Sequence, residues 1–317
     1  MVKKTISFVL FFMIYPVLIK ADSYDYTVAQ DGSGDFTKIQ DVIDAIPHLR
    51  KNRTVVFIKK GIYKEKLMLP TTKTNVTFIG EDVNETILTY DDYAKKKNQF
   101  GEEIGTSGSS SFYIYGNGFE AYNITFENSS GPVGQAVAVY VNADKIKFEN
   151  CRFLGFQDTL FPNGKESRQY YKNCYLDGTV DFIFGGATAV FDSCEIYCKT
   201  HGYITAASTD KESEFGFVFV NCTIHSNAPA SSFYLGRPWR DYAKTVFINC
   251  YLDQHIKPEG WHNWSKPEAE KTAYYAEYQN SGPGCVPAKR VKWSHQLTAE
   301  EAGTYTLKNI FNDWKVE

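Results

Sequence analysis

The chain has 317 residues, 43% of them hydrophobic, so it is long enough to bury a substantial core. Its formal net charge of −3 argues against a general nucleic-acid-binding role, because phosphate backbones attract basic surfaces. Its seven cysteines lack the paired close spacing of zinc ligands. Composition and charge therefore exclude a basic nucleic-acid-binding protein and a zinc-finger domain.

The N-terminus has the pattern of a secretion signal. A positively charged start precedes an apolar run over residues 6–19, and Ala21 supplies a small residue for cleavage. A membrane anchor is the alternative, but the run is short and contains Pro16. We predict a signal peptide over residues 1–21 and one mature domain over residues 22–317, secreted to the cell exterior, the cell wall or the periplasm. No membrane attachment is expected after cleavage.

Five cysteines sit in one repeated pattern: a β-rich run, a small polar residue, the cysteine and an alternating tail. The steps between copies are 23, 20, 28 and 28 residues. This period indicates a solenoid, and the missing helical periodicity and leucine spacing disfavour a βαβ sheet and leucine-rich repeats. The sequence therefore predicts an all-β, right-handed parallel β-helix. The copies are residues 146–154, 169–176, 189–196, 217–224 and 246–252, with an earlier copy at 122–129 that lacks cysteine.

The repeated cysteines are expected to stack in the core as small apolar residues. A disulfide between Cys174 and Cys194 is the alternative, because neighbouring coils place Cα atoms about 4.8 Å apart, within disulfide range. We prefer the core interpretation.

The two ends of the solenoid need covering, because an open end exposes unpaired strand edges. Residues 36–46 place apolar side chains on one helical face, with Pro47 at the end, and predict a short N-terminal capping helix. From about Lys257 the repeat pattern is lost. We predict an irregular C-terminal segment that crosses back over the outside of the solenoid.

Three polar residues keep step with the repeat. Asp158 follows Cys151 by seven residues, and Asp181 follows Cys174 by seven. Gln135 precedes Asp158 by 23 residues, the same interval that separates the two aspartates. If the cysteines stack, the two carboxylates and the amide lie on successive coils about 5 Å apart.

Two stacked carboxylates repel, and folding alone does not favour the arrangement. A turn role is the ordinary explanation for a single Asp before a strand, but a pair in register favours chemistry. Coupled carboxylates titrate as a pair, so one can hold a proton while the other acts as a nucleophile. A spacing of about 5 Å also suits a retaining glycosidase.

Neighbouring residues favour acyl transfer over glycosyl transfer. Gln135 and Gln157 can direct amide N–H groups at an oxyanion, which acyl transfer requires. Arg237, constrained between Gly and Pro, would lower the pKa of Asp181 and keep it ionised. Trp239 offers an apolar face for a sugar ring, although a core position is equally compatible.

These motifs, taken in order, resemble those of the pectin methylesterases, or pectinesterases, from about Tyr26 to Trp314. The matching stretches are VAQDGSGDFTKIQDVIDAIP from Val28, GIYKE from Gly61, GPVGQAVAV from Gly131, GFQDTL from Gly155, GTVDFIFG from Gly178, LGRPW from Leu235, PEGWHNW from Pro258 and YYAEYQNSGPG from Tyr274. The resemblance implies a parallel β-helix that hydrolyses methyl esters of galacturonate in pectin. It also implies no metal or organic cofactor, and we expect a monomer.

The resemblance further implies a role for each matching residue. Asp181 is the expected nucleophile, and Asp158 the general acid that later activates water. Gln135 and Gln157 are expected to stabilise the oxyanion, and Arg237 to hold Asp181. Substrate contacts are expected from Trp239 and Trp261, with weaker candidates in Phe156 and Phe182.

Three further hypotheses remain open. Polygalacturonases and pectate lyases are also β-helices, and shortening of demethylated chains would favour them. A non-catalytic carbohydrate-binding relative would need Asp158, Asp181 or Arg237 to be replaced, and none is. An esterase of another acyl substrate could use the same scaffold, but the retained Arg237 and tryptophans argue against it.

Overall fold

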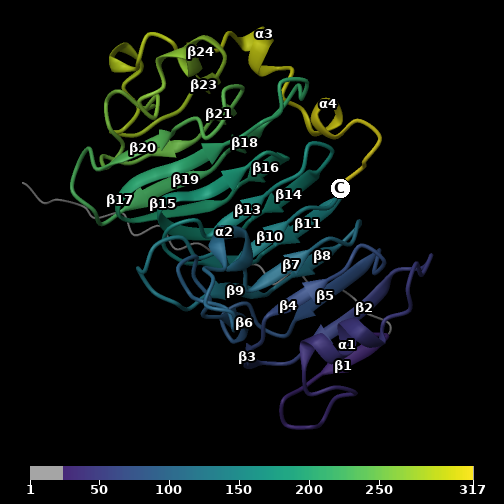
Figure 1. The fold of residues 1–317 in the computed structure, drawn as a ribbon. Helices are drawn as coiled ribbons and strands as arrows, with labels where there is room; N and C mark the ends of the chain where they lie inside the picture. The colour runs from purple at the N-terminus through teal and green to yellow at the C-terminus, as the bar shows by residue number, and fades with distance from the viewer. Residues whose placement is uncertain (1–23, 317) are drawn as a thin grey trace, which may run out of the picture.

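The computed structural model describes residues 24–316 and shows parallel strands stacked coil upon coil into an elongated solenoid (Figure 1). The predicted signal peptide, residues 1–21, lies outside the described residues. Across residues 24–316 we find no helix with the length and apolar character needed to cross a membrane.

One sheet has eleven strands, and each strand belongs to a successive coil. In spatial order they are β1 (Tyr26–Val28), β2 (Thr54–Ile58), β5 (Val76–Gly80), β8 (Glu120–Tyr122), β11 (Ile146–Glu149), β14 (Arg168–Lys172), β16 (Thr188–Asp192), β18 (Phe217–Val220), β21 (Lys244–Ile248), β23 (Tyr274–Tyr278) and β24 (His295–Gln296).

The second, thirteen-stranded sheet wraps around the other walls of the solenoid. Its main path runs through β3 (Gly61–Lys64), β6 (Thr86–Tyr90), β9 (Thr125–Asn128), β12 (Arg152–Leu154), β15 (Tyr175–Gly185), β13 (Leu160–Pro162), β10 (Val139–Val141), β7 (Phe112–Ile114) and β4 (Leu67–Leu69). Off this path lie β17 (Glu195–Ala207), β19 (Thr223–Ser226), β20 (Phe233–Gly236) and β22 (Tyr251–Leu252). The long strand β15 pairs with both β12 and β13, so one strand follows two walls.

The polar residue before each repeated cysteine makes the corner between the two sheets. These residues have a left-handed backbone, which Asn tolerates better than most side chains. They are Asn150, Asn173, Ser193, Asn221 and Asn249, and Asn123 takes the same backbone in the earlier copy without cysteine. All six have φ between 51° and 57°. The repeat seen in the sequence is therefore a repeat of corners.

The cysteines after these corners stack inside the solenoid. Register pairs such as Arg152 with Tyr175 and Tyr175 with Glu195 bring Cys151, Cys174 and Cys194 onto successive coils. All seven cysteines are free thiols, and six are buried. This confirms the core interpretation over a Cys174–Cys194 disulfide.

Aromatic rings form a second internal stack. Tyr171 stacks on Phe191 with ring centroids 4.6 Å apart, Phe191 on Phe219 at 4.5 Å, and Phe219 on Phe247 at 4.4 Å. Stacked rings bury large apolar areas, which stabilises neighbouring coils against each other. One hydrophobic cluster runs from Val28 to Tyr275 and supports the proposal of a single domain.

The predicted N-terminal helix is present as α1 (Ile39–Ala45), which buries Ile39, Val42 and Ile43 against the first coils. Beyond it, the helical segments are short. They are α2 (Gly105–Gly108), α3 (Ala299–Ala302), α4 (Leu307–Phe311) and the 3₁₀ turns Pro267–Lys271 and Pro287–Lys289.

The C-terminal prediction is partly wrong. The repeat does not end near Lys257, because β23 and β24 continue the first sheet. Neither strand carries the Asn–Cys corner that marked the earlier copies. The last residues do cross back over the outside, where the ring of Phe311 contacts Tyr170 and its carbonyl accepts a 2.7 Å hydrogen bond from Arg168.

Candidate active site

The two aspartates meet on neighbouring coils, as their spacing predicts. Asp158 lies just before β13 and Asp181 lies within β15, where Leu160 pairs with Ile183 and the Asp158 N–H donates to the carbonyl of Val180 at 3.1 Å. Both aspartates have positive φ, 65° and 54°. Non-glycine residues held in this region are uncommon and cluster at functional sites.

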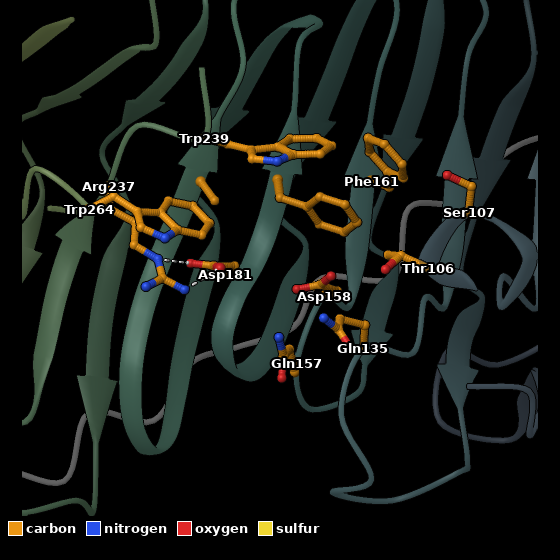
Figure 2. A pocket seen from close by; sticks show the side chains of 12 residues that line it. Thr106, Ser107, Gln135, Gln157, Asp158, Phe161, Asp181, Arg237, Trp239 and Trp264 are labelled. Carbon is orange, nitrogen blue, oxygen red and sulfur yellow. Dashed lines mark hydrogen bonds and ion pairs between the residues drawn. The ribbon is translucent and has the colours of Figure 1, made fainter. Parts of the chain in front are cut away.

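A surface cavity of about 420 Å³ opens over the two carboxylates (Figure 2). It combines polar groups on its floor with aromatic rings on one wall. Its lining residues are Thr106, Ser107, Gln135, Gln157, Asp158, Phe161, Asp181, Phe184, Ala206, Arg237, Trp239 and Trp264. Five predicted catalytic residues and one predicted substrate-binding residue therefore share this cavity.

Arg237 holds Asp181 at two points. Its Nε donates to Oδ1 at 2.8 Å and its Nη2 donates to Oδ2 at 2.7 Å. The guanidinium lies between two rings, 3.9 Å from the centroid of Tyr203 and 3.7 Å from that of Trp264. Planar contacts on both faces and a two-point bond on its edge leave the guanidinium little freedom.

The two carboxyl groups have different electrostatic surroundings. Burial raises the pKa of Asp158 well above its ordinary value, and the negative charge of Asp181 raises it further. Burial also raises the pKa of Asp181, but two hydrogen bonds and the positive charge of Arg237 oppose that rise. Arg237 lowers the pKa of Asp181, as predicted, but burial raises that pKa by more than Arg237 lowers it. The pKa of Asp158 is thus raised without the opposing hydrogen bonds that Arg237 gives to Asp181.

The two glutamines lie side by side at the edge of this pair. Gln135 pairs with Gln157 across a parallel bridge, and both line the cavity. The prediction that Gln135 stacks in register with Asp158 is wrong by one residue. This coil is shorter than the 23 residues assumed. Gln135 bridges Gln157 at an interval of 22 residues, and further along the coil Val139 pairs with Leu160 at an interval of 21. The two side-chain amides still face the carboxylates (Figure 2).

The aromatic wall contains one predicted and several unpredicted residues. Trp239 contacts Phe161 and Phe184, with ring centroids 6.0 and 5.8 Å apart, and Phe161 stacks on Phe184 at 4.1 Å. Phe161 follows Asp158 by three residues, and Phe184 follows Asp181 by three. That repeated spacing is a signal that could have found them, whereas Trp264, Thr106 and Ser107 carry no comparable sequence signal.

Three predicted substrate-binding residues do not line the cavity. Trp261 is 1% exposed and stacks inside the solenoid on Tyr275 at 4.4 Å, beside its isolated bridge to Gly236. Phe182 is fully buried in the main core. Phe156 is partly exposed, but its ring lies beneath the ammonium of Lys199, 4.2 Å from the centroid.

No cluster of three or more His, Cys, Asp or Glu side chains suited to a metal ion occurs among residues 24–316. The chemistry that the described cavity offers is that of a parallel β-helix hydrolase with two carboxyl groups, two amides and a fixed guanidinium.

Comparison with known proteins gives this class a family. The pectinesterase family model matches residues 25–313. Pectinesterase 31 of Arabidopsis thaliana is 44% identical over 284 residues, covering 88% of this chain and 89% of the relative. The probable pectinesterase/pectinesterase inhibitor 13 of the same plant is 38% identical, and the match covers 95% of this chain but 51% of that relative.

Solved structures agree with the family model. Pectin methylesterase from carrot matches with a TM-score of 0.80 and 33% identity, covering 93% of this chain and 98% of the carrot chain. A pectin methylesterase in complex with a hexasaccharide matches with a TM-score of 0.82 and 29% identity, covering 94% and 99% of the two chains. The chain belongs to the pectinesterase family of carboxylic ester hydrolases, on a parallel β-helix.

Proposed function

We propose that this chain demethylesterifies pectin through Asp181 as nucleophile and Asp158 as general acid and base. The observation that carries this assignment is the unequal environment of two neighbouring carboxyl groups. Asp181 is held by Arg237 at two points, whereas Asp158 has a pKa raised well above its ordinary value. This difference supports Asp181, beside the cation, as the ionised nucleophile and Asp158 as the protonated acid.

In the first step a carboxylate oxygen of Asp181 attacks the carbonyl carbon of a galacturonate methyl ester. The carbonyl electrons move to oxygen, and the amides of Gln135 and Gln157 stabilise the resulting oxyanion. When the carbonyl re-forms, the bond to methoxide breaks and Asp158 gives its proton to the departing methanol. An acyl-enzyme on Asp181 remains.

In the second step Asp158, now a carboxylate, takes a proton from water. The hydroxide attacks the galacturonyl carbonyl, and the bond to Asp181 breaks. The product forms as a carboxylic acid and releases its remaining proton to solvent, which leaves a free carboxylate on the galacturonate. Asp158 is then protonated and Asp181 ionised, as at the start.

Pectin as the substrate is supported by the aromatic wall and by the comparison. Trp239, Phe161 and Phe184 provide an apolar surface beside the carboxylates, which suits the face of a sugar ring. The related pectin methylesterase was solved with a hexasaccharide bound. These two observations support a methylated homogalacturonan as the substrate.

The decisive assay is methanol release set against viscosity loss on highly methylated pectin. We expect methanol release without early loss of viscosity. Asp158→Asn should lose most methanol release, while Asp192→Asn, a matched change on the first sheet, should keep it. Rapid viscosity loss with little methanol would instead identify a chain-cleaving enzyme and overturn the proposal.

We also infer that the mature enzyme is a secreted monomer. The predicted signal peptide and a cell-wall substrate support secretion, and neither nucleic acid nor a membrane is an expected partner of the mature chain. Expression in a secreting host with N-terminal sequencing tests this. We expect the protein to be found in the culture medium, to start near Asp22 and to elute as a monomer. Protein that stays in the cells or keeps its N-terminal segment would contradict the inference.

A further inference from the structure

The turn over residues 155–158 carries two groups of the active site, Gln157 and Asp158. Both backbone polar groups of its first residue are held from behind. The N–H of Gly155 donates to Oδ1 of Asp177 at 3.0 Å, and the carbonyl of Gly155 accepts from Nζ of Lys199 at 2.6 Å.

Asp177 and Lys199 are themselves an ion pair. Nζ of Lys199 lies 2.9 Å from Oδ1 of Asp177, and the two side chains are 23% and 10% exposed. They come from β15 and β17, which pair beside them through Gly178 and Cys198. One cation and one anion on two adjacent strands thus bind the same backbone residue on the preceding coil.

Further contacts fix the turn on either side of Gly155. The ring of Phe156 lies under the Lys199 ammonium, and the carbonyl of Phe156 accepts from the N–H of Thr179 at 2.9 Å. The hydroxyl of Thr159 donates to the carbonyl of Asp177 at 3.1 Å. A side chain at Gly155 would come within 2.6 Å of that hydroxyl, so the turn is closely packed as well as bonded.

We propose that the Asp177–Lys199 ion pair is a positioning device that sets where Gln157 and Asp158 lie relative to Asp181. This inference rests on the proposed function, because it gives the pair a role only if those residues carry the chemistry. Ion pairs with little solvent access gain little net stability, since desolvation offsets their attraction. Catalysis, in contrast, is sensitive to displacements of about 1 Å.

The primary test is Lys199→Met, which keeps the side-chain stem and removes the ammonium. We expect kcat on methylated pectin to fall by roughly 10- to 100-fold with KM within about twofold, because the oxyanion groups move while the aromatic wall stays. Lys199→Arg, which keeps the charge and donors, should recover most of the loss. Lys199→Met alone leaves the charge of Asp177 unpaired, which could impair folding. The Asp177→Asn/Lys199→Met double variant leaves no unpaired charge, and we expect the same fall in kcat from it.

The pH profile separates positioning from mere stability. Asp158 faces Asp181, Arg237 and Gln157, and its raised pKa depends on burial and on its closeness to Asp181. A loosened turn lets Asp158 move outward, so the alkaline limb of kcat in Lys199→Met should shift to lower pH. If the ion pair acts on stability alone, Lys199→Met should lower the melting temperature and leave the alkaline limb of kcat in place.

Asp144→Asn is the matched control. Asp144 forms an ion pair with Arg168, at a distance of 2.6 Å, and this pair lies away from the catalytic turn. The Asp144→Asn variant should leave kcat and the pH profile unchanged. The positioning role would be overturned if Lys199→Met and the double variant both kept the wild-type kcat and an unshifted alkaline limb. That outcome is distinct from failure of the proposed function, which would appear as full activity in Asp158→Asn.

Discussion

Arg237 and Asp181 form a two-point ion pair in which the guanidinium edge matches both carboxylate oxygens, at 2.8 and 2.7 Å. The pair points the carboxylate into the cavity beside Asp158 (Figure 2). The guanidinium lies 3.9 Å from the ring centroid of Tyr203 and 3.7 Å from that of Trp264. Orientation and charge are thus supplied by one side chain. The consequence is that a cation alone should not replace Arg237.

Arg237→Lys is expected to lower kcat about 100-fold, because a lysine keeps the charge but cannot bind both oxygens or fill the space between the rings. Steady-state methanol release measures the effect. Arg168→Lys is the matched control, since Arg168 makes the same two-point bond to Asp144, at 2.9 and 2.6 Å, outside the cavity. Equal kcat in Arg237→Lys and wild type would show that geometry at Asp181 is unimportant.

The rate should depend on pH through both aspartates. Asp181 must be ionised, so kcat/KM falls as the pH drops through its pKa, which burial raises above 3.8. Asp158 must be protonated, so kcat/KM falls as the pH rises through its pKa, which lies well above 3.8. Because the two groups interact, both limbs belong to the pair. If kcat/KM did not fall at alkaline pH, the assignment of Asp158 as the protonated acid of the free enzyme would be contradicted.

Asp158→Asn should make the protein more stable at neutral pH. Between its ordinary pKa of 3.8 and its raised folded value, Asp158 holds a proton that the unfolded chain releases, so rising pH lowers wild-type stability in that window. An amide removes this loss and should raise the free energy of unfolding by about 1 kcal/mol near neutrality. Urea unfolding tests this, and the gain should shrink below pH 3.8. If Asp158→Asn were less stable than wild type at neutral pH, the result would count against a buried, protonated carboxyl at position 158.

The tryptophans Trp239 and Trp261 should respond differently to substitution. Trp239→Ala removes the cavity wall and should raise KM roughly threefold to tenfold with little change in melting temperature. Trp261→Phe shrinks a fully buried side chain and should cost about 1–3 kcal/mol of stability while KM stays near wild type. Paired kinetic and urea-unfolding measurements decide between the two effects. A raised KM in Trp261→Phe would return that residue to the substrate site.

The solenoid and its paired aspartates could be predicted from the sequence because they follow from a periodic requirement. In the five repeated copies Asn or Ser fills a left-handed corner, and a cysteine packs inside directly after it. Once Cys151 and Cys174 are aligned, Asp158 and Asp181 must also align. The capping helix α1 was predictable for a similar reason, since its apolar face repeats at the helical period.

Features outside that period could not be predicted in the same way. The coil holding Gln135 is shorter than its neighbours, so equal spacing placed it one residue out of register. In the segment from Pro258, the side chain of Trp261 points inward and that of Trp264 points to the cavity. Which tryptophan faces out depends on the bridge between Gly236 and Trp261, a contact that the local sequence does not specify.

Methanol release by Asp181→Ala tests the central assignment most directly, with Asp192→Ala as a control for substitution at a folded, unrelated aspartate. Both variants should melt cooperatively, so that activity refers to folded protein. We expect the Asp192 variant to match wild type and the Asp181 variant to lose about 10⁴-fold or more in kcat, as removal of a nucleophile does. Wild-type methanol release from folded Asp181→Ala protein would contradict the account.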